Sequence, residues 1–207
     1  MRRTLALLLL FSVFFSFSAL AEEGPRLYIH PSLGYSFEMP GDWIFADESK
    51  MPDEKNLQDF ALTEEEEKAI AEAGMAVFLA PDGYRLTITR EFLPLPLTAE
   101  LFMSMMMSHK LTEMEAAVEG ISFPDHPSVY YTEDDRAFCH LTALYPVENE
   151  KHTLTRYFLT EGDAMYVLSF VAPLDLSEED AEDLAYDYKW LTRALLDTFF
   201  PAPVLLQ

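Results

Sequence analysis

The sequence predicts an α+β domain with a central antiparallel β-sheet flanked by helices. Three observations lead to this prediction. Apolar and polar residues alternate through several short segments, and short turn sequences join the last three of these into an antiparallel meander. Two other stretches, one after Thr98 and one ending near Phe199, repeat apolar residues at helical spacing. The 207 residues contain no internal repeat and no linker that would separate two domains.

The N-terminal stretch has the three parts of a secretory signal peptide. Arg2 and Arg3 supply positive charge, residues 5–17 form an apolar run broken only by two serines, and Ala19-Leu20-Ala21 is a small-x-small cleavage site. We therefore expect a signal peptide at residues 1–21 and a location in the cell envelope or periplasm, or secretion. An uncleaved anchor is the alternative, although the apolar run is short for a bilayer span.

Cleavage would leave one acidic domain at residues 22–200 and a C-terminal tail at 201–207. It removes two of the 14 basic residues and none of the 36 acidic ones, so the net charge becomes −24 (12 − 36). Nucleic acid is excluded as a partner, because its binding needs a basic surface. The acidic surface also argues against binding to anionic lipid headgroups. Stable membrane insertion after cleavage is not expected.

The first strands and turn are predicted near the start of the domain. Residues 27–30 form a brief strand, and Tyr35, Phe37 and Met39 alternate with polar residues as in a half-buried strand. Pro40 and Gly41 fit the two central positions of a type II turn, where proline fixes φ and glycine accepts a positive φ. The following segment, Trp43-Ile44-Phe45, is expected to fasten the returning chain to the core.

A short helix and a hairpin follow an irregular polar stretch at residues 47–61. Thr63 and Glu66 have the spacing of a capping box, and Gly74 is expected to end the helix. Segments 75–80 and 84–92 flank Pro81-Asp82-Gly83, which is typical of a hairpin turn. Alternation along the second arm places four apolar side chains on one face: Tyr84, Leu86, Ile88 and Phe92.

The next helix is predicted after its cap at Thr98 and carries the sequence AELFMSMMMSHKLTEMEAAV. Its expected apolar face consists of Leu101, Phe102, Met105 and Met106. Strands are predicted at 128–132, 137–145, 152–160 and 164–172. Ser177 is expected to cap a final helix whose sheet-facing residues are Leu184, Tyr188, Leu191, Leu195 and Thr198 or Phe199.

The sequence meets none of the motif classes that identify common catalytic sites. It has no His-x-x-x-His or His-Glu-x-x-His zinc motif, no Gly-x-Ser-x-Gly or Ser-x-x-Lys nucleophile motif, and no glycine-rich phosphate loop. The single cysteine, Cys139, lies in an alternating segment and is interpreted as a buried core thiol. His140 is its neighbour, but successive side chains on a strand point to opposite faces, so the two do not predict a catalytic pair.

The methionine-rich segment is the most unusual local composition. Core packing, a groove for a partner and a Cu(I) site are the three interpretations, because methionine is both adaptable core filler and a soft ligand. Three consecutive methionines cannot all face one core, so we expect a candidate partner surface at Met103, Met106, Met107 and His109. The acidic clusters at 64–67, 134–135 and 178–183 leave a weak Ca²⁺ site as an alternative to solvated helix starts.

The stretch GYSFEMPGDW at 34–43, with AMYVLSFVAP and LLDTFF late in the chain, resembles the PsbP/Mog1/DcrB-like superfamily. The resemblance covers residues 28–200 and implies an α/β/α sandwich. The positions that match it are structural: Tyr35, Phe37, Pro40, Gly41 and Trp43. No functional residue carries over, because members of this superfamily share a scaffold and not an active site.

The resemblance and the signal peptide together imply the exported bacterial branch of the superfamily. The expected function is that of a non-catalytic accessory or binding protein with no cofactor, acting on an unknown protein or small-ligand partner. A divalent-cation-binding accessory protein that uses its acidic loops is the alternative. A hydrolytic enzyme without a recognisable motif is the third possibility, since convergent sites are formed in space and not in sequence.

Overall fold

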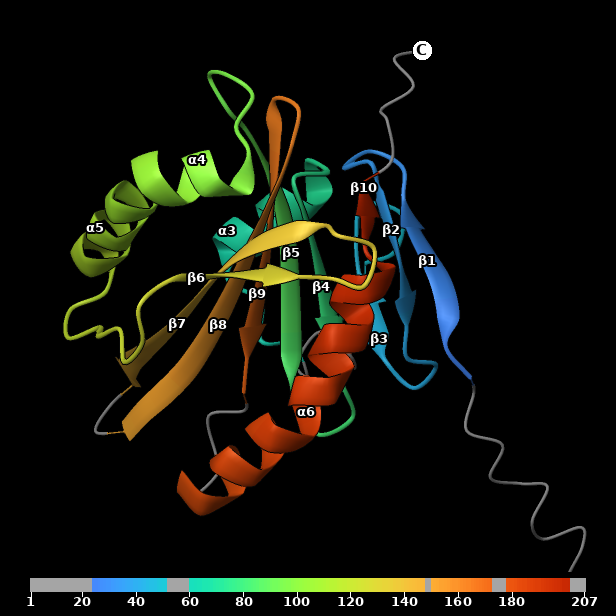
Figure 1. Ribbon diagram of the computed structural model, residues 1–207. Helices are drawn as coiled ribbons and strands as arrows, with labels where there is room; N and C mark the ends of the chain where they lie inside the picture. The colour runs from blue at the N-terminus through green and yellow to red at the C-terminus, as the bar shows by residue number, and fades with distance from the viewer. Residues whose placement is uncertain (1–23, 52–59, 148–149, 173–177, 202–207) are drawn as a thin grey trace, which may run out of the picture.

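The computed structural model describes residues 24–51, 60–147, 150–172 and 178–201 (Figure 1). The strands are β1 (Arg26–His30), β2 (Tyr35–Met39), β3 (Ile44–Ala46), β4 (Met75–Leu79), β5 (Arg85–Phe92), β6 (Ser128–Tyr131), β7 (Ala137–Val147), β8 (Glu150–Glu161), β9 (Ala164–Val171) and β10 (Phe200–Pro201). The helices are α3 (Glu64–Ala71), α4 (Ala99–Met105), α5 (Met107–Ala117) and α6 (Glu178–Thr198). The expected signal peptide and the Ser177 cap lie outside the described residues.

A seven-stranded antiparallel sheet is the centre of the domain, in the order β3-β4-β5-β9-β8-β7-β6. The predicted α+β class and the meander of β7, β8 and β9 are thereby confirmed. Strands β1, β2 and β10 form a separate three-stranded sheet. The two early strands therefore do not extend the central sheet but belong to a second layer.

Helices cover both faces of the large sheet. On one face, α3 packs over Val77 through Ile70, while α4 and α5 pack over Cys139 and Leu141. On the other face, α6 and the three-stranded sheet share one layer over the largest apolar cluster (Figure 1). Because β-strand side chains alternate between faces, each strand of the meander contributes to both cores.

Strand β2 is the inner strand of the small sheet, and its alternation is as predicted. Tyr35, Phe37 and Met39 are buried, and the Tyr35 ring stacks on Phe199 at a centroid distance of 5.2 Å. Pro201 pairs with Tyr35 in the sheet, so the ordered fold extends one residue into the predicted tail. The hydroxyl of Tyr166 on β9 donates to the Gly34 carbonyl (2.8 Å), which fastens the start of β2 to the large sheet.

The turn after β2 differs from the prediction. The Trp43 N–H donates to the Pro40 carbonyl (3.2 Å), so the turn runs from Pro40 to Trp43, with Gly41 and Asp42 in its centre. Gly41 does not take a positive φ; Gly34 does, at 71°. Pro40 therefore occupies the first position of the turn, and not a central one as predicted, because its carbonyl accepts the hydrogen bond that closes the turn. Trp43 is buried as expected, and Ile44 and Phe45 enter strand β3.

The capping box of α3 is confirmed. The Thr63 hydroxyl accepts from the Glu66 N–H (3.2 Å), and the Glu66 carboxylate accepts from the Thr63 N–H (3.0 Å). The predicted helix end is shifted by one residue, because Ala73 takes the left-handed conformation (φ 57°) while Gly74 donates back to the Ala69 carbonyl (2.8 Å). This is a Schellman motif with alanine in the position that glycine usually fills.

The hairpin of β4 and β5 is confirmed, with Leu79 paired to Arg85 and Gly83 at φ 86°. Of the predicted apolar face, Tyr84, Leu86 and Ile88 are buried. Phe92 is not: it is 74% exposed, with the Arg90 guanidinium 5.0 Å from its ring centroid. Phe92 lies at the end of β5, beyond the reach of the covering layer.

The helix after Thr98 is broken, contrary to the prediction of one continuous helix. Thr98 caps α4, accepting from the Leu101 N–H (3.3 Å), and α4 ends at Met105. Met106 stays in the αR region, but its φ of −108° and ψ of −24° depart from the usual helical values, and α5 begins at Met107, which is buried. Phe102 is buried, whereas Leu101 and Met105 are exposed, so the predicted apolar face is wrong at two of its four positions.

Candidate ligand pocket

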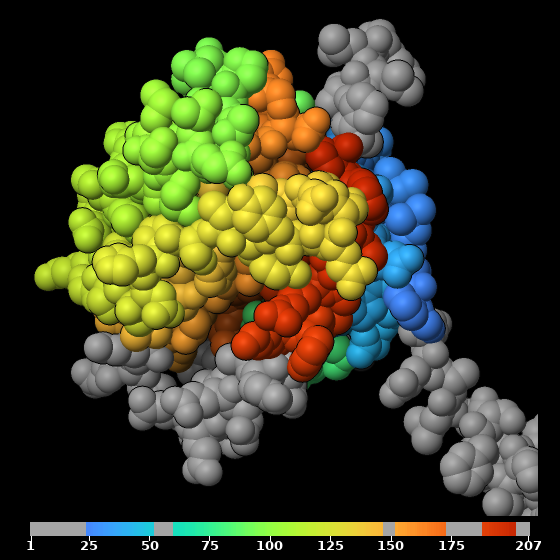
Figure 2. Space-filling view, viewed as in Figure 1, coloured from blue at the N-terminus to red at the C-terminus, as the bar shows by residue number. Residues whose placement is uncertain are grey.

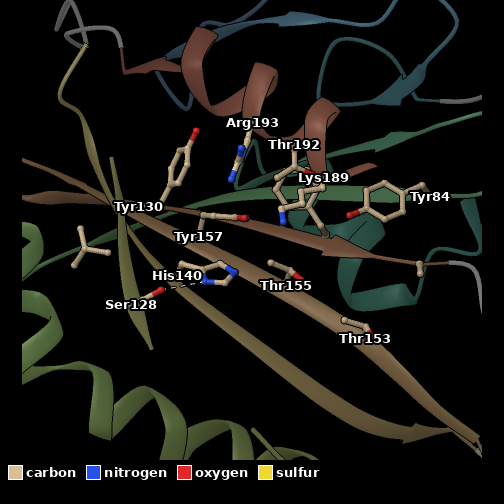
Figure 3. Close-up of a pocket in the computed structure, with 13 residues that line it drawn as sticks. Tyr84, Ser128, Tyr130, His140, Thr153, Thr155, Tyr157, Lys189, Thr192 and Arg193 are labelled. Atoms are coloured by element: carbon tan, nitrogen blue, oxygen red, sulfur yellow. Dashed lines mark hydrogen bonds between the residues drawn. The ribbon is translucent and has the colours of Figure 1, made fainter. Parts of the chain in front are cut away.

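A pocket of about 350 Å³ lies between α6 and the large sheet (Figure 3). Strands β6, β7, β8 and β9 form its floor together with Tyr84, which precedes β5, and α6 forms its other wall. In the space-filling view, α6 and β6, the edge strand of the large sheet, lie on the same visible face of the molecule (Figure 2). The lining residues are Tyr84, Ser128, Val129, Tyr130, His140, Thr153, Thr155, Tyr157, Phe170, Ala172, Lys189, Thr192 and Arg193.

Strand alternation and helical period place these side chains. On β8, Thr153, Thr155 and Tyr157 are two residues apart and therefore share one face of the sheet. On α6, Lys189 and Arg193 are one turn apart and project from the same side of the helix. Figure 3 shows both cations reaching from the helix toward the strands.

Aromatic rings form much of the floor. The Tyr157 ring lies 4.8 Å from the His140 ring and 5.9 Å from the Phe170 ring, measured between centroids. Tyr130 lies 6.3 Å from Tyr157 and closes the floor on the β6 side. Tyr84 closes the opposite side. Such rings present flat apolar surface with hydroxyl groups at the edge, which is typical of sites for small organic ligands.

The protonation states in the pocket follow from burial. Burial lowers the pKa of His140, against the opposing effect of the Asp125 carboxylate, and so favours the neutral ring. Burial also raises the pKa of Tyr157 to about 12, so its hydroxyl remains a donor at neutral pH. The Ser128 Oγ lies 3.4 Å from His140 Nδ1, the one hydrogen-bond contact between lining residues drawn in Figure 3.

The charge of the pocket is opposite to that of the chain. Lys189 and Arg193 line it, and no aspartate or glutamate is among the described lining residues. Neither cation forms an ion pair with a described carboxylate. This arrangement can hold a negatively charged group beside an apolar floor.

The predicted partner surface is only partly a surface. Met107 is 3% exposed and belongs to the core under α4 and α5, so it cannot contribute to a partner surface. Met103 and Met106 are half-buried and pack against the same core. His109 is exposed and lies 3.1 Å from the Glu113 carboxylate on its own helix. Core packing therefore accounts for most of the methionine-rich segment.

Cys139 is a buried core thiol, as predicted. It donates to the Ala99 carbonyl at 3.2 Å, and burial raises the pKa of the thiol to about 12. His140 points to the opposite face, into the pocket. Within residues 24–51, 60–147, 150–172 and 178–201, no three histidine, cysteine, aspartate or glutamate side chains converge as metal ligands would. The helices in these ranges include none that is long and apolar enough to span a membrane.

The comparisons with known proteins concern the fold. No family model matches the chain, and no curated protein matches it. The solution structure of cyanobacterial PsbP from Synechocystis matches with a TM-score of 0.56 at 15% identity, covering 88% of this chain and 95% of that chain. The fold is PsbP-like.

Two further solved structures give lower scores. A Bacteroides thetaiotaomicron protein matches with a TM-score of 0.46 at 14% identity, covering 87% of this chain and 49% of that chain. A Pseudomonas aeruginosa protein of unknown function, described as a putative regulator, matches with a TM-score of 0.47 at 13% identity, covering 87% and 99%. The PsbP-like assignment rests on the cyanobacterial structure, because scores below 0.5 carry no argument about the fold.

Sequence reasoning did not predict the pocket. Its residues come from β6, β7, β8, β9 and α6, which are brought together only by the sheet order and by the position of α6. One signal was present: Lys189 and Arg193 are two cations one helical turn apart in a chain with far more acidic than basic residues. That spacing indicates a basic helix face, but not what the face covers.

Proposed function

We propose that this chain is an exported, non-catalytic accessory protein that binds a small organic ligand in the pocket between α6 and the sheet. The pocket itself is the observation that carries the proposal. Its volume of about 350 Å³ falls within the range of ligand sites, and aromatic floor and scattered hydroxyls are the usual lining of such sites. The PsbP-like fold supports an accessory role, and the N-terminal sequence supports export.

The contact between Ser128 and His140 is the one that a hydrolytic enzyme would use. Its 3.4 Å separation is longer than the usual nucleophile–base distance, and no described carboxylate hydrogen-bonds to the ring to orient it. The Ser128 and His140 backbones are also paired with each other in the sheet. These features favour binding over catalysis, and Ser128→Ala provides the check: it should leave any hydrolysis of model esters by the purified protein unchanged.

A ligand screen with a blocking variant tests the proposed function. Thr155→Phe places a ring inside the pocket, and Thr112→Phe is its control, because Thr112 is exposed on α5, which covers the opposite face of the sheet. A library of one- and two-ring compounds is screened by thermal shift, since a ligand that binds only the folded state raises the midpoint. Binders should lose their effect in Thr155→Phe and keep it in Thr112→Phe. Binding that survives in both variants would place the ligand elsewhere and contradict the proposal.

A further inference from the structure

We infer that the ligand is a flat organic carboxylate, held by Lys189 and Arg193 with its ring against Tyr157 and His140. This inference rests on the proposed function and names the chemical class of its ligand. The charge and shape of the residues that line the pocket carry it.

The position of these two cations, and not their lack of an ion pair, sets them apart. Among the described residues, Lys68, Arg85, Lys110 and Arg136 lie within 4 Å of a carboxylate, whereas Arg26, Lys50, Arg90 and Arg156 do not lie that close to a described one. Lys189 and Arg193 instead face a cavity whose described lining carries no carboxylate. An acidic molecule repels anions in general, so a local pair of cations is needed for an anion to bind there at all.

The two cations and their neighbours suit a carboxylate in particular. An arginine guanidinium matches a carboxylate with two parallel N–H donors, and a lysine adds a mobile point charge. Thr192 lies between them in sequence and also lines the pocket. Figure 3 shows Arg193 directed toward Tyr130 and Tyr157, so an anion held by this side chain lies next to the aromatic floor.

The floor defines the body of the ligand. Tyr157 and His140 lie 4.8 Å apart with an interplanar angle of 36°, and Phe170 meets Tyr157 at 89°. A flat unsaturated ring can stack on one of these faces and meet the edge of another. Because burial favours the neutral form of His140, the floor adds no third positive charge, and binding selectivity for the anion comes from α6.

Sets of probes with equal shape and different charge test the inference. The full chain, expressed with its own N-terminal segment and purified as the host processes it, is titrated calorimetrically with 4-hydroxybenzoate, 4-hydroxybenzamide and 4-hydroxybenzylamine, and with 2-naphthoate and 2-naphthamide. We expect each acid to bind at least tenfold more tightly than its amide, and the amine not to bind. Raising the salt concentration should weaken the binding of the acids and leave that of the amides unchanged, since Lys189 and Arg193 are exposed to solvent.

Charge variants assign the effect to α6. Arg193→Gln and Lys189→Gln should each lower the affinity for the acids by about tenfold and leave the affinity for the amides unchanged. Lys68→Gln is the matched control: it removes the same charge from α3, on the opposite face of the sheet, and should leave all affinities unchanged.

The outcomes separate the two proposals. Amides that bind as tightly as acids, and are blocked by Thr155→Phe, would overturn the carboxylate inference and leave the proposed function standing. Acids that bind equally well to Arg193→Gln and Lys189→Gln would also overturn it. If no acid or amide of either set binds at millimolar concentration, while some other compound of the wider screen is blocked by Thr155→Phe, only the carboxylate inference fails. If no compound in either experiment binds, both fail.

Discussion

The buried imidazole Nε2 of His30 lies 2.9 Å from the partly exposed Glu48 carboxylate. The other ring nitrogen, Nδ1, accepts from the Leu33 main-chain N–H (3.2 Å), so the neutral ring carries its proton toward Glu48. Burial lowers the pKa of His30, against the opposing charges of Glu48 and Asp47. Protonation would place a second N–H against the Leu33 donor.

This arrangement predicts that the domain loses stability as the pH falls below the ordinary histidine value of 6.5. As the pH falls, the unfolded chain takes up the proton first, because the pKa of His30 is lower in the folded state. The stabilising contribution of the neutral ring is therefore complete above pH 6.5 and is lost as the pH falls toward the pKa of the folded state. Urea unfolding between pH 5 and 8 measures the slope. His140 shifts in the same direction, so the comparison is with His30→Gln, which should flatten the slope. An unchanged slope in that variant would exclude His30 as the source.

Ala73→Gly should stabilise the protein. Ala73 holds φ at 57° at the end of α3, a conformation that costs an L-residue about 1–2 kcal/mol and glycine little. We expect a gain of about 1 kcal/mol, seen as a thermal midpoint about 2–4 °C higher. Ala71→Gly, two residues earlier within the helix, is the control and should lower the stability by about 1 kcal/mol. A loss of stability in both variants would mean that the methyl group of Ala73 contributes packing that outweighs its strain.

Arg156→Met should also raise the stability. The Arg156 side chain emerges from β8 between Leu141 and Ser169, and its Nε is buried without a hydrogen-bond partner. Burial lowers the pKa of its guanidinium, although Glu91 acts in the opposite direction. Methionine keeps an apolar stem and removes a charge that is costly to bury, so a gain of about 1 kcal/mol is expected from chemical denaturation.

Arg85→Met is the matched variant for this measurement. Arg85 lies on the same sheet face but donates to Glu66 at 2.8 Å, a contact that also braces the α3 capping box. Its replacement should lower the stability by about 1 kcal/mol, because it leaves Glu66 without its cation. Equal changes in the two variants would show that the presence of an ion pair does not determine whether replacing a buried arginine raises or lowers the stability.

Methionine substitutions test the break between α4 and α5. Met107→Ala should cost about 2–4 kcal/mol because it opens a cavity in the core, whereas Met105→Ala should change the stability by less than about 0.5 kcal/mol. Met107 is 3% exposed and Met105 is 60% exposed. Thermal and urea unfolding of both variants measure the difference. Similar losses would indicate that the helix continues through Met106.

Features governed by near neighbours could be predicted from the sequence. The Thr63–Glu66 capping box depends on residues three apart, and the opposite directions of Cys139 and His140 follow from strand alternation alone. The turn after β2 could not be predicted fully: a Pro-Gly pair fits several turn positions, and the hydrogen bond from Trp43 to Pro40 decides which one is used.

The strand and helix segments, the buried thiol and the acidic character of the chain follow from local periodicity or from composition. Which faces are covered depends on the tertiary structure. It turned Met107 inward at the break in the helix, left Phe92 exposed beyond the covering layer, and brought Lys189 and Arg193 over Tyr157. These outcomes depend on contacts between residues far apart in the chain, whose free energies no local pattern records.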